Sequence, residues 1–373
     1  MRFLPDLEQR DFARSLDALL TAAGTPALVR AWAAGDTAPG RALWTRLAAA
    51  GVFALAVPER HGGAGLRPAE LAVAFTELGR HAVPGPLVET VAAAAFLDRL
   101  GDGVTAAAWL PAIASGTAAV SFAVLSPGGP YALDADTADA VFAVDGDTVR
   151  LAESAGAVQP SADPARRLAR PLGGTVLAQG PAVRAAAAHA TRVARLATAA
   201  QSLGLGRALL AHTVEHARRR TQFGVAIGSF QAVKHRLADA LIALEFAQPL
   251  VHSAALALAG GDPCADGLST DGLSADDLSV GDLSADREIA AAKVAAGEAA
   301  HATALTALHL HGALGYTDEL DLSLWVRKAR PLRDAWGTPS VCRARVLAST
   351  GIGAGIEAGA GGASPVAGKG ASA

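Results

Sequence analysis

The sequence predicts a mainly α-helical protein with a small β domain in its middle. Alanine and leucine dominate the 373 residues and aromatic residues make up only 5%, a composition that favours helix over strand. Apolar residues recur at three- and four-residue spacing in the first hundred residues and again after residue 182, as they do along one face of a helix. Between these regions, short apolar runs separated by turn residues predict strands.

These patterns divide the chain into three expected domains and a tail. Residues 1–104 should form an N-terminal helical domain, residues 105–181 a middle β domain, and residues 182–350 a C-terminal bundle. Residues 351–373 are rich in glycine, alanine and serine and have little apolar surface to bury, so we expect a disordered tail.

The N-terminal helices are predicted from apolar side chains that share one helix face, namely Phe12, Leu16, Leu19, Leu20, Leu43, Leu47, Leu71, Phe75 and Leu78. A glycine-rich segment, Val57–Leu66, lies between them. It lacks the Lys-Ser/Thr pair of a phosphate-binding P-loop, and no strand–helix unit surrounds it, so we expect an ordinary loop. We expect His61 to be a loop histidine without a catalytic role.

In the middle domain, strands are expected at Ala119–Leu125, Ala140–Val144, Thr148–Leu151 and Thr175–Leu177. The segment Asp145-Gly146-Asp147 lies between two of these runs and is typical of a tight hairpin turn. A compact β domain follows from this pattern.

The C-terminal region contains four long helical runs, which predict an antiparallel four-helix bundle. We expect the helices at residues 182–217, 230–259, 287–311 and 321–332. A low-complexity segment at residues 262–286, with a five-residue repeat, interrupts the bundle. It is too short to stack as a solenoid, so we expect a flexible acidic loop.

Charge and cysteine content exclude several classes of function. A net charge of −3 without a long basic run argues against nucleic acid as a partner. The N-terminus lacks the apolar core of a signal peptide and no apolar run is long enough to span a membrane, so we expect a soluble, cytoplasmic protein without a membrane partner. Cys264 and Cys342 have no metal-type spacing, so we expect no metal site.

The stretch Ala217–Asp239 has the residue types of a site for a phosphate beside a planar ring. The guanidinium of Arg220 can grip phosphate oxygens in two places, and the ring of Phe223 can stack on a planar group. Gln231 can donate or accept a hydrogen bond at a polar edge.

A second stretch, His309–Glu319, ends a helix with two spaced glycines. Glycine accepts backbone conformations that other residues avoid and allows a ligand to come close to the main chain. We therefore take Gly312 and Gly315 as candidate cofactor-binding positions. His309 is a candidate hydrogen-bonding residue, with an ordinary surface or core histidine as the alternative.

Together these stretches resemble two signatures of the acyl-CoA dehydrogenase family, R-x-Q-F-G-x-x-[IL]-x-x-F-Q and a later Q/H-x-x-G-G-x-G. The resemblance covers about residues 3–346. In this chain the two signatures are represented by Arg220, Thr221, Gln222, Phe223, Gly224, Ile227, Phe230, Gln231, His309, Gly312 and Gly315, with Ala313 in place of the second glycine.

The resemblance implies a fold and a reaction. The fold would consist of an N-terminal helical domain, a central β-barrel-like domain and a C-terminal four-helix bundle. The reaction would be α,β-dehydrogenation of an acyl-CoA substrate with FAD as cofactor. Electrons would pass to an electron-transfer flavoprotein, and the protein would act in fatty acid or steroid side-chain metabolism.

The chain departs from the family where the catalytic base is expected. Most members carry a glutamate in a Y-E-G-T segment, and Trp336 stands in its place. A minority carry the base as Glu-Arg early in the long bundle helix, and this chain has Ala194-Arg195 there. Asp334, two residues from the usual position, is the weak candidate that remains.

The β domain also departs from the family pattern. The usual T-E-P-x-A-G-S-D loop is replaced by residues 125–131, LSPGGPY, and no tryptophan–threonine segment follows. In the family, the signature arginine and phenylalanine reach the flavin nucleotide of a neighbouring subunit. The pattern thus resembles degenerate subunits of actinobacterial heteromeric acyl-CoA dehydrogenases. We expect a homo- or hetero-oligomer, a dimer or tetramer, with a paralogous subunit.

Two alternatives to a dehydrogenase follow from the same departures. The chain could be a non-catalytic partner that stabilises an active paralogue and completes its flavin site. It could also be a related flavin monooxygenase on the same fold, since such an enzyme does not need the glutamate base.

Overall fold

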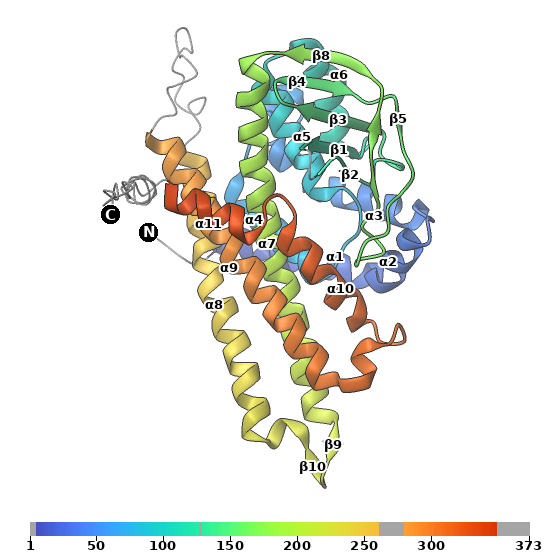
Figure 1. Ribbon diagram of the computed structural model, residues 1–373, viewed down its shortest axis with the longest axis vertical. Coiled ribbons are helices and arrows are strands. Elements are labelled where there is room, and N and C mark those ends of the chain that lie inside the picture. The colour runs from blue at the N-terminus through green and yellow to red at the C-terminus, as the bar shows by residue number, and fades with distance from the viewer. Residues whose placement is uncertain (1–4, 127–128, 261–279, 349–373) are drawn as a thin grey trace, which may run out of the picture.

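The computed structural model describes residues 5–126, 129–260 and 280–348. Two helical regions lie before and after a small β region, which sits beside the upper half of the long helix α7 (Figure 1). This arrangement confirms the predicted fold class. The helices are α1 Leu7–Ala23, α2 Thr25–Ala33, α3 Ala38–Ala49, α4 Pro68–Arg80, α5 Leu87–Leu100, α6 Gly103–Ala114, α7 Pro181–Arg219, α8 Gln231–Gly260, α9 Val280–His311, α10 Leu322–Asp334 and α11 Pro339–Ala348.

The N-terminal helices bury the apolar faces that the sequence predicts. Helix α1 begins at a capping box, in which the side chains of Asp6 and Gln9 each accept a hydrogen bond from the other's backbone N–H. The predicted core residues Leu16, Leu47 and Phe75 are fully buried. Helix α6 crosses the expected boundary at residue 104, so helical structure continues to Ala114.

The β region is built on one four-stranded sheet in the order β1-β3-β4-β8. Its strands, β1 Val120–Val124, β3 Ala140–Asp145, β4 Thr148–Leu151 and β8 Thr175–Gln179, match the four predicted runs. Strands β3 and β4 form the predicted hairpin, and Gly146 in its turn has a φ of 59°. Strands β1 and β3 pair in parallel, which the sequence pattern does not reveal.

Further short strands form pairs in the β region, and one more pair lies at the far end of the bundle. Strand β2 pairs with β6, β5 with β7, and β9 with β10. Their two-residue length explains why no apolar periodicity marks them in the sequence. Their bounds are β2 Ala132–Leu133, β5 Ser154–Ala155, β6 Leu168–Ala169, β7 Pro171–Leu172, β9 Thr221–Gln222 and β10 Val225–Ala226.

Helix α7 is the central element of the molecule and packs against α4, α5, α8, α9 and α10. Two glycines allow α4 and α7 to cross closely: a Cβ built on Gly204 would lie 1.8 Å from the Thr76 carbonyl oxygen, and one on Gly79 would lie 1.9 Å from that of Gln201. Larger residues would force the backbones apart.

Two details of the bundle differ from the predictions. Helix α9 begins at Val280, inside the segment predicted as a loop, and Asp286 in its early turns pairs with Arg195 and Arg345. An additional helix, α11, packs on α9. The rest of the predicted loop up to residue 279, and the predicted tail at 351–373, lie outside the described residues.

Among the described residues, helix α8 is long and apolar enough by composition to cross a membrane, with a mean hydropathy of 1.5. Helices in protein cores meet the same criterion, so a single such helix is weak evidence. The face of α8 that includes Leu244, Val251 and Leu258 is buried within the bundle.

Candidate functional site

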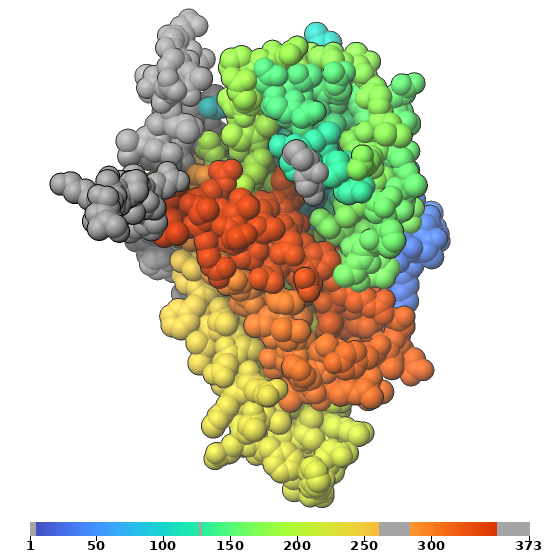
Figure 2. Space-filling view, viewed as in Figure 1, coloured from blue at the N-terminus to red at the C-terminus, as the bar shows by residue number. Residues whose placement is uncertain are grey.

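A cavity of about 460 Å³ lies between the β region and the end of α10. The two parts of the chain meet on the face seen in Figure 2. Aromatic, basic and acidic side chains share its wall, among them Tyr131, Arg166, Arg330, Asp334 and Trp336. The structure therefore places Asp334 and Trp336, the two residues at and near the expected base position, on one open cavity.

Trp336 is held firmly in this wall. Its backbone adopts a left-handed conformation with a φ of 58°, which is uncommon for a bulky residue. The indole stacks on Phe122 of β1, with ring centroids 6.1 Å apart and an angle of 7° between the planes. The indole Nε1 donates a 3.1 Å hydrogen bond to Glu89 Oε1 in α5. The indole nitrogen is a donor only, so Trp336 cannot accept a proton.

Arg195 and Lys293 donate hydrogen bonds to backbone carbonyls at and near Trp336. Arg195 Nε donates to the Trp336 carbonyl over 2.9 Å. The neighbour of Ala194, one expected base position, thus contacts Trp336, the other, although Arg195 and Trp336 lie 141 residues apart in the sequence. Lys293 is 2% exposed, and its Nζ donates to the Arg333 carbonyl over 2.6 Å. Burial lowers the pKa of Lys293 to about 8.

A smaller chamber of about 50 Å³ lies behind Trp336. It is lined by Glu89, by Asp134, and by an ion pair in which Lys328 Nζ lies 2.8 Å from Asp163 Oδ2. Burial raises the pKa of Glu89, and it raises the pKa of Asp134 from 3.8 to about 8. Sequence inspection does not reveal this chamber, because its acidic residues come from α5 and from separate loops.

The residues predicted to bind a phosphate and a planar ring lie at the opposite end of the bundle. Phe223 is 93% exposed at the turn between β9 and β10, with a φ of 52°. Its ring makes an edge-to-face contact with Phe230, at a centroid distance of 6.3 Å. Arg220 ends α7 and Gln231 begins α8, and both are exposed. This tip, residues 220–231, projects from the lower end of the molecule in Figure 2.

The glycine-turn residues lie near this tip. His216, one turn before the end of α7, stacks on His311 at the end of α9, with centroids 4.0 Å apart. Burial lowers the pKa of both imidazoles, and a hydrogen bond between His311 Nδ1 and the Ala307 carbonyl opposes this for His311. The structure thus places the second stretch beside the residue that immediately precedes the first.

Three further candidates lie within a few residues of His311. His309 is exposed, and Gly312 is exposed with a φ of 59°. Gly315 is buried, and a Cβ on it would lie 3.1 Å from the Leu308 carbonyl oxygen. The closest neighbours of Gly315 are therefore Leu308 and His311, at the end of the preceding helix α9.

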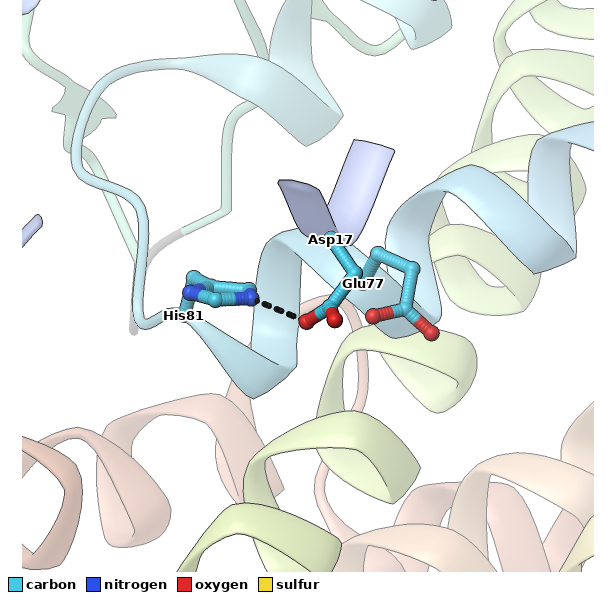
Figure 3. Close-up of side chains that lie close together, drawn as sticks. All are labelled: Asp17, Glu77 and His81. Carbon is cyan, nitrogen blue, oxygen red and sulfur yellow. Dashed lines mark hydrogen bonds and ion pairs between the residues drawn. The ribbon is translucent and has the colours of Figure 1, made fainter. Parts of the chain in front are cut away.

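A separate cluster joins α1 to α4 (Figure 3). His81 Nε2 lies 2.8 Å from Asp17 Oδ1, and a carboxylate oxygen of Glu77 lies within 4.8 Å of the other two side chains. Arg80 Nη1 lies 3.8 Å from Asp17 Oδ1 and 3.6 Å from Glu77 Oε2, so a positive charge already faces both carboxylates. The cluster is thus an ion-pair network, and its geometry disfavours a metal ion.

Two family models match most of the chain. The acyl-CoA dehydrogenase N-terminal domain matches residues 6–117, and the acyl-CoA dehydrogenase C-terminal domain matches residues 184–350. The chain is 37% identical to acyl-CoA dehydrogenase IpdE2 of Mycobacterium tuberculosis over 253 residues, which cover 66% of this chain and 76% of that relative.

Solved structures share the fold over almost the whole length. The structure of PigA with FAD and proline has a TM-score of 0.75 at 19% identity, covering 94% of this chain and 100% of PigA. The ChsE4–ChsE5 complex from Mycobacterium tuberculosis has a TM-score of 0.72 at 23% identity, covering 94% of this chain and 99% of that one. These similarities extend across both helical regions and the β region.

Proposed function

Because the chain belongs to the acyl-CoA dehydrogenase family, we propose that it is one subunit of an assembly that oxidises an acyl-CoA thioester between its α and β carbons. The observation that carries this proposal is the placement of Trp336. It occupies the expected base position and is held there by Phe122, Glu89 and Arg195. The base for the α-proton would come from a second, paralogous subunit.

The tip residues fit the role of completing a flavin site held by that second subunit. Phe223 offers an exposed ring, and Arg220 has no ion pair with the described residues, so its guanidinium is available for a phosphate. FAD, when bound, would accept the hydride from the β carbon. The chain's own part would be to grip the nucleotide with Arg220, Phe223 and Gln231. His309 and the turn at Gly312 lie at the same end of the bundle.

An exposed apolar stripe on α8 supports an oligomer. Ile242, Phe246 and Leu250 follow one another at four-residue spacing and are 52%, 72% and 41% exposed, with Leu241 beside them at 49%. Contiguous exposed apolar side chains mark protein interfaces. The solved ChsE4–ChsE5 structure is also that of a complex. The assembly would act in the cytoplasm and pass electrons to an electron-transfer flavoprotein.

A second candidate is a dehydrogenase that is complete in itself. It is favoured by Asp334, which lines the same cavity as Trp336 and is the acid that could take the α-proton there. Under this alternative, a homo-oligomer of the chain would bind flavin and oxidise acyl-CoA without a paralogue.

The two candidates are separated by the flavin absorbance of purified protein. We expect the chain to be colourless alone and yellow when co-expressed with a homologue that carries glutamate in its Y-E-G-T segment. Arg220→Ala should lower the flavin content of the co-expressed assembly, whereas Arg150→Ala, an exposed arginine on β4, should not. A yellow homo-oligomer whose dehydrogenase activity is abolished by Asp334→Asn would establish the second candidate instead.

A further inference from the structure

The small chamber behind Trp336 adjoins the larger cavity. Arg166, Pro331, Ala335 and Trp336 line both, so they form the wall that the two spaces share. A volume of about 50 Å³ has room for three or four water-sized groups. An acyl group lying in the larger cavity would therefore meet the chamber across this wall.

Among the described residues, two carboxyl oxygens in the chamber have neither a hydrogen-bond nor an ion-pair partner, whereas Asp163 Oδ2 is paired with Lys328. Glu89 is 7% exposed, and its Oε1 accepts from Trp336 while its Oε2 is unpaired. Asp134 is fully buried, and its Oδ1 accepts from Trp32 Nε1 over 3.0 Å while its Oδ2 is unpaired. Buried polar atoms in folded proteins are nearly always paired, so both oxygens require a partner that enters the chamber.

The chemistry of that partner follows from the state of the two acids. Burial raises the pKa of both acids and so favours their protonated forms, and a protonated carboxyl group can both donate and accept a hydrogen bond. A hydroxyl group has the same dual capacity. A negatively charged group could only accept hydrogen bonds and would lose its hydration in the buried chamber, and an apolar group would leave both oxygens unpaired.

We propose that this chamber binds a hydroxyl group carried by the acyl chain of the substrate, with Glu89 and Asp134 as its hydrogen-bonding partners. The inference rests on the proposed function, because it assumes an acyl-CoA in the larger cavity. Glu89 and Asp134 would then determine specificity. A site built to pair a substrate hydroxyl strongly rejects the analogue that lacks it.

The test compares hexanoyl-CoA with 6-hydroxyhexanoyl-CoA, with both affinities measured by isothermal titration calorimetry on the purified assembly. We expect the hydroxylated ester to bind at least about tenfold more tightly. Glu89→Met, which removes the polar group at similar volume, should bring the two affinities within about twofold. Asp134→Asn is the second variant, for use if Glu89→Met does not fold, and should reduce the preference. Glu77→Gln, at a buried acid with a raised pKa outside the chamber, is the matched control and should keep it.

Equal affinities for the two esters would overturn the proposal, with the chamber then holding only water. A preference for the hydroxylated ester that survives in both chamber variants would also overturn the proposal, as would a failure of both esters to bind. The proposed function is judged separately by flavin absorbance and dehydrogenation in the assembly. An active, yellow assembly without ester preference would therefore refute the chamber alone.

Discussion

Replacing Asp134 with asparagine should make the stability of the protein less dependent on pH. Asp134 is fully buried, and burial raises its pKa from 3.8 to about 8. Glu89 and Asp136 raise this pKa further, whereas the hydrogen bond from Trp32 and the charge of Lys328 lower it. Asparagine keeps an acceptor for Trp32 Nε1 and tolerates the left-handed backbone at this position, where φ is 51°.

The sign of the effect follows from proton binding. Because the pKa is higher in the folded than in the unfolded chain, the folded state binds more protons between pH 4 and pH 8. The stability that this group contributes is fully present below about pH 4 and is lost as pH rises towards 8. The loss amounts to about 1.4 kcal/mol per pH unit, or about 6 kcal/mol over the whole window. An asparagine side chain does not titrate, so this contribution disappears in the variant.

The measurement is urea denaturation of the purified chain at several values between pH 5 and pH 8. Wild type should lose about 4 kcal/mol of unfolding free energy from this group across that range. Asp134→Asn should lack this loss and retain only the decline that other groups such as Glu89 cause. Asp98→Asn, at a partly exposed acid that pairs with Arg60, serves as the control and should follow wild type. Parallel pH curves for wild type and Asp134→Asn would refute the reasoning.

Three further variants test other parts of the structure. Trp336→Phe keeps a ring against Phe122 but removes the hydrogen-bond donor to Glu89. The free energy of unfolding, measured by chemical denaturation, should therefore fall by about 1–3 kcal/mol. An unchanged value would show that this hydrogen bond does not stabilise the fold. Gly204→Ala should lower the melting temperature markedly, because the added Cβ would lie 1.8 Å from the Thr76 carbonyl oxygen. A melting curve equal to that of wild type would show that α4 and α7 can move apart at no cost. Phe223→Ser should change the free energy of unfolding by less than about 0.5 kcal/mol, because the ring is 93% exposed. It should nevertheless reduce flavin retention in the co-expressed assembly. Full flavin retention, measured by absorbance, would exclude Phe223 from the flavin contact.

At the expected position of the base, the structure connects two residues that lie far apart in the sequence. Sequence inspection identifies Trp336 and Ala194-Arg195 as two separate departures from the family. The structure joins them through the hydrogen bond from Arg195 to the Trp336 carbonyl and closes the space with Phe122 and Glu89. A glutamate placed at residue 336 would thus need this whole group of contacts to rearrange.

Local pattern alone determined much of this protein. The amphipathic spacing of Leu16, Leu47 and Phe75, the turn at Gly146, and the family signature at Arg220 and Phe223 are read from neighbouring residues, because helix faces, hairpin turns and short motifs depend on nearby positions. These features were sufficient for the fold class and for the family.

Tertiary structure alone decided the parallel pairing of β1 with β3, the contact between His216 and His311, and the chamber formed by Glu89 and Asp134. Each depends on residues that are distant in the sequence and come together only when helices and sheet pack. No local periodicity encodes such a meeting, and the cost of burying an acid exists only once the surrounding side chains exclude water. The sequence was therefore enough to nominate the exposed tip as a candidate site, because its motif is continuous, and was not enough to nominate the buried chamber.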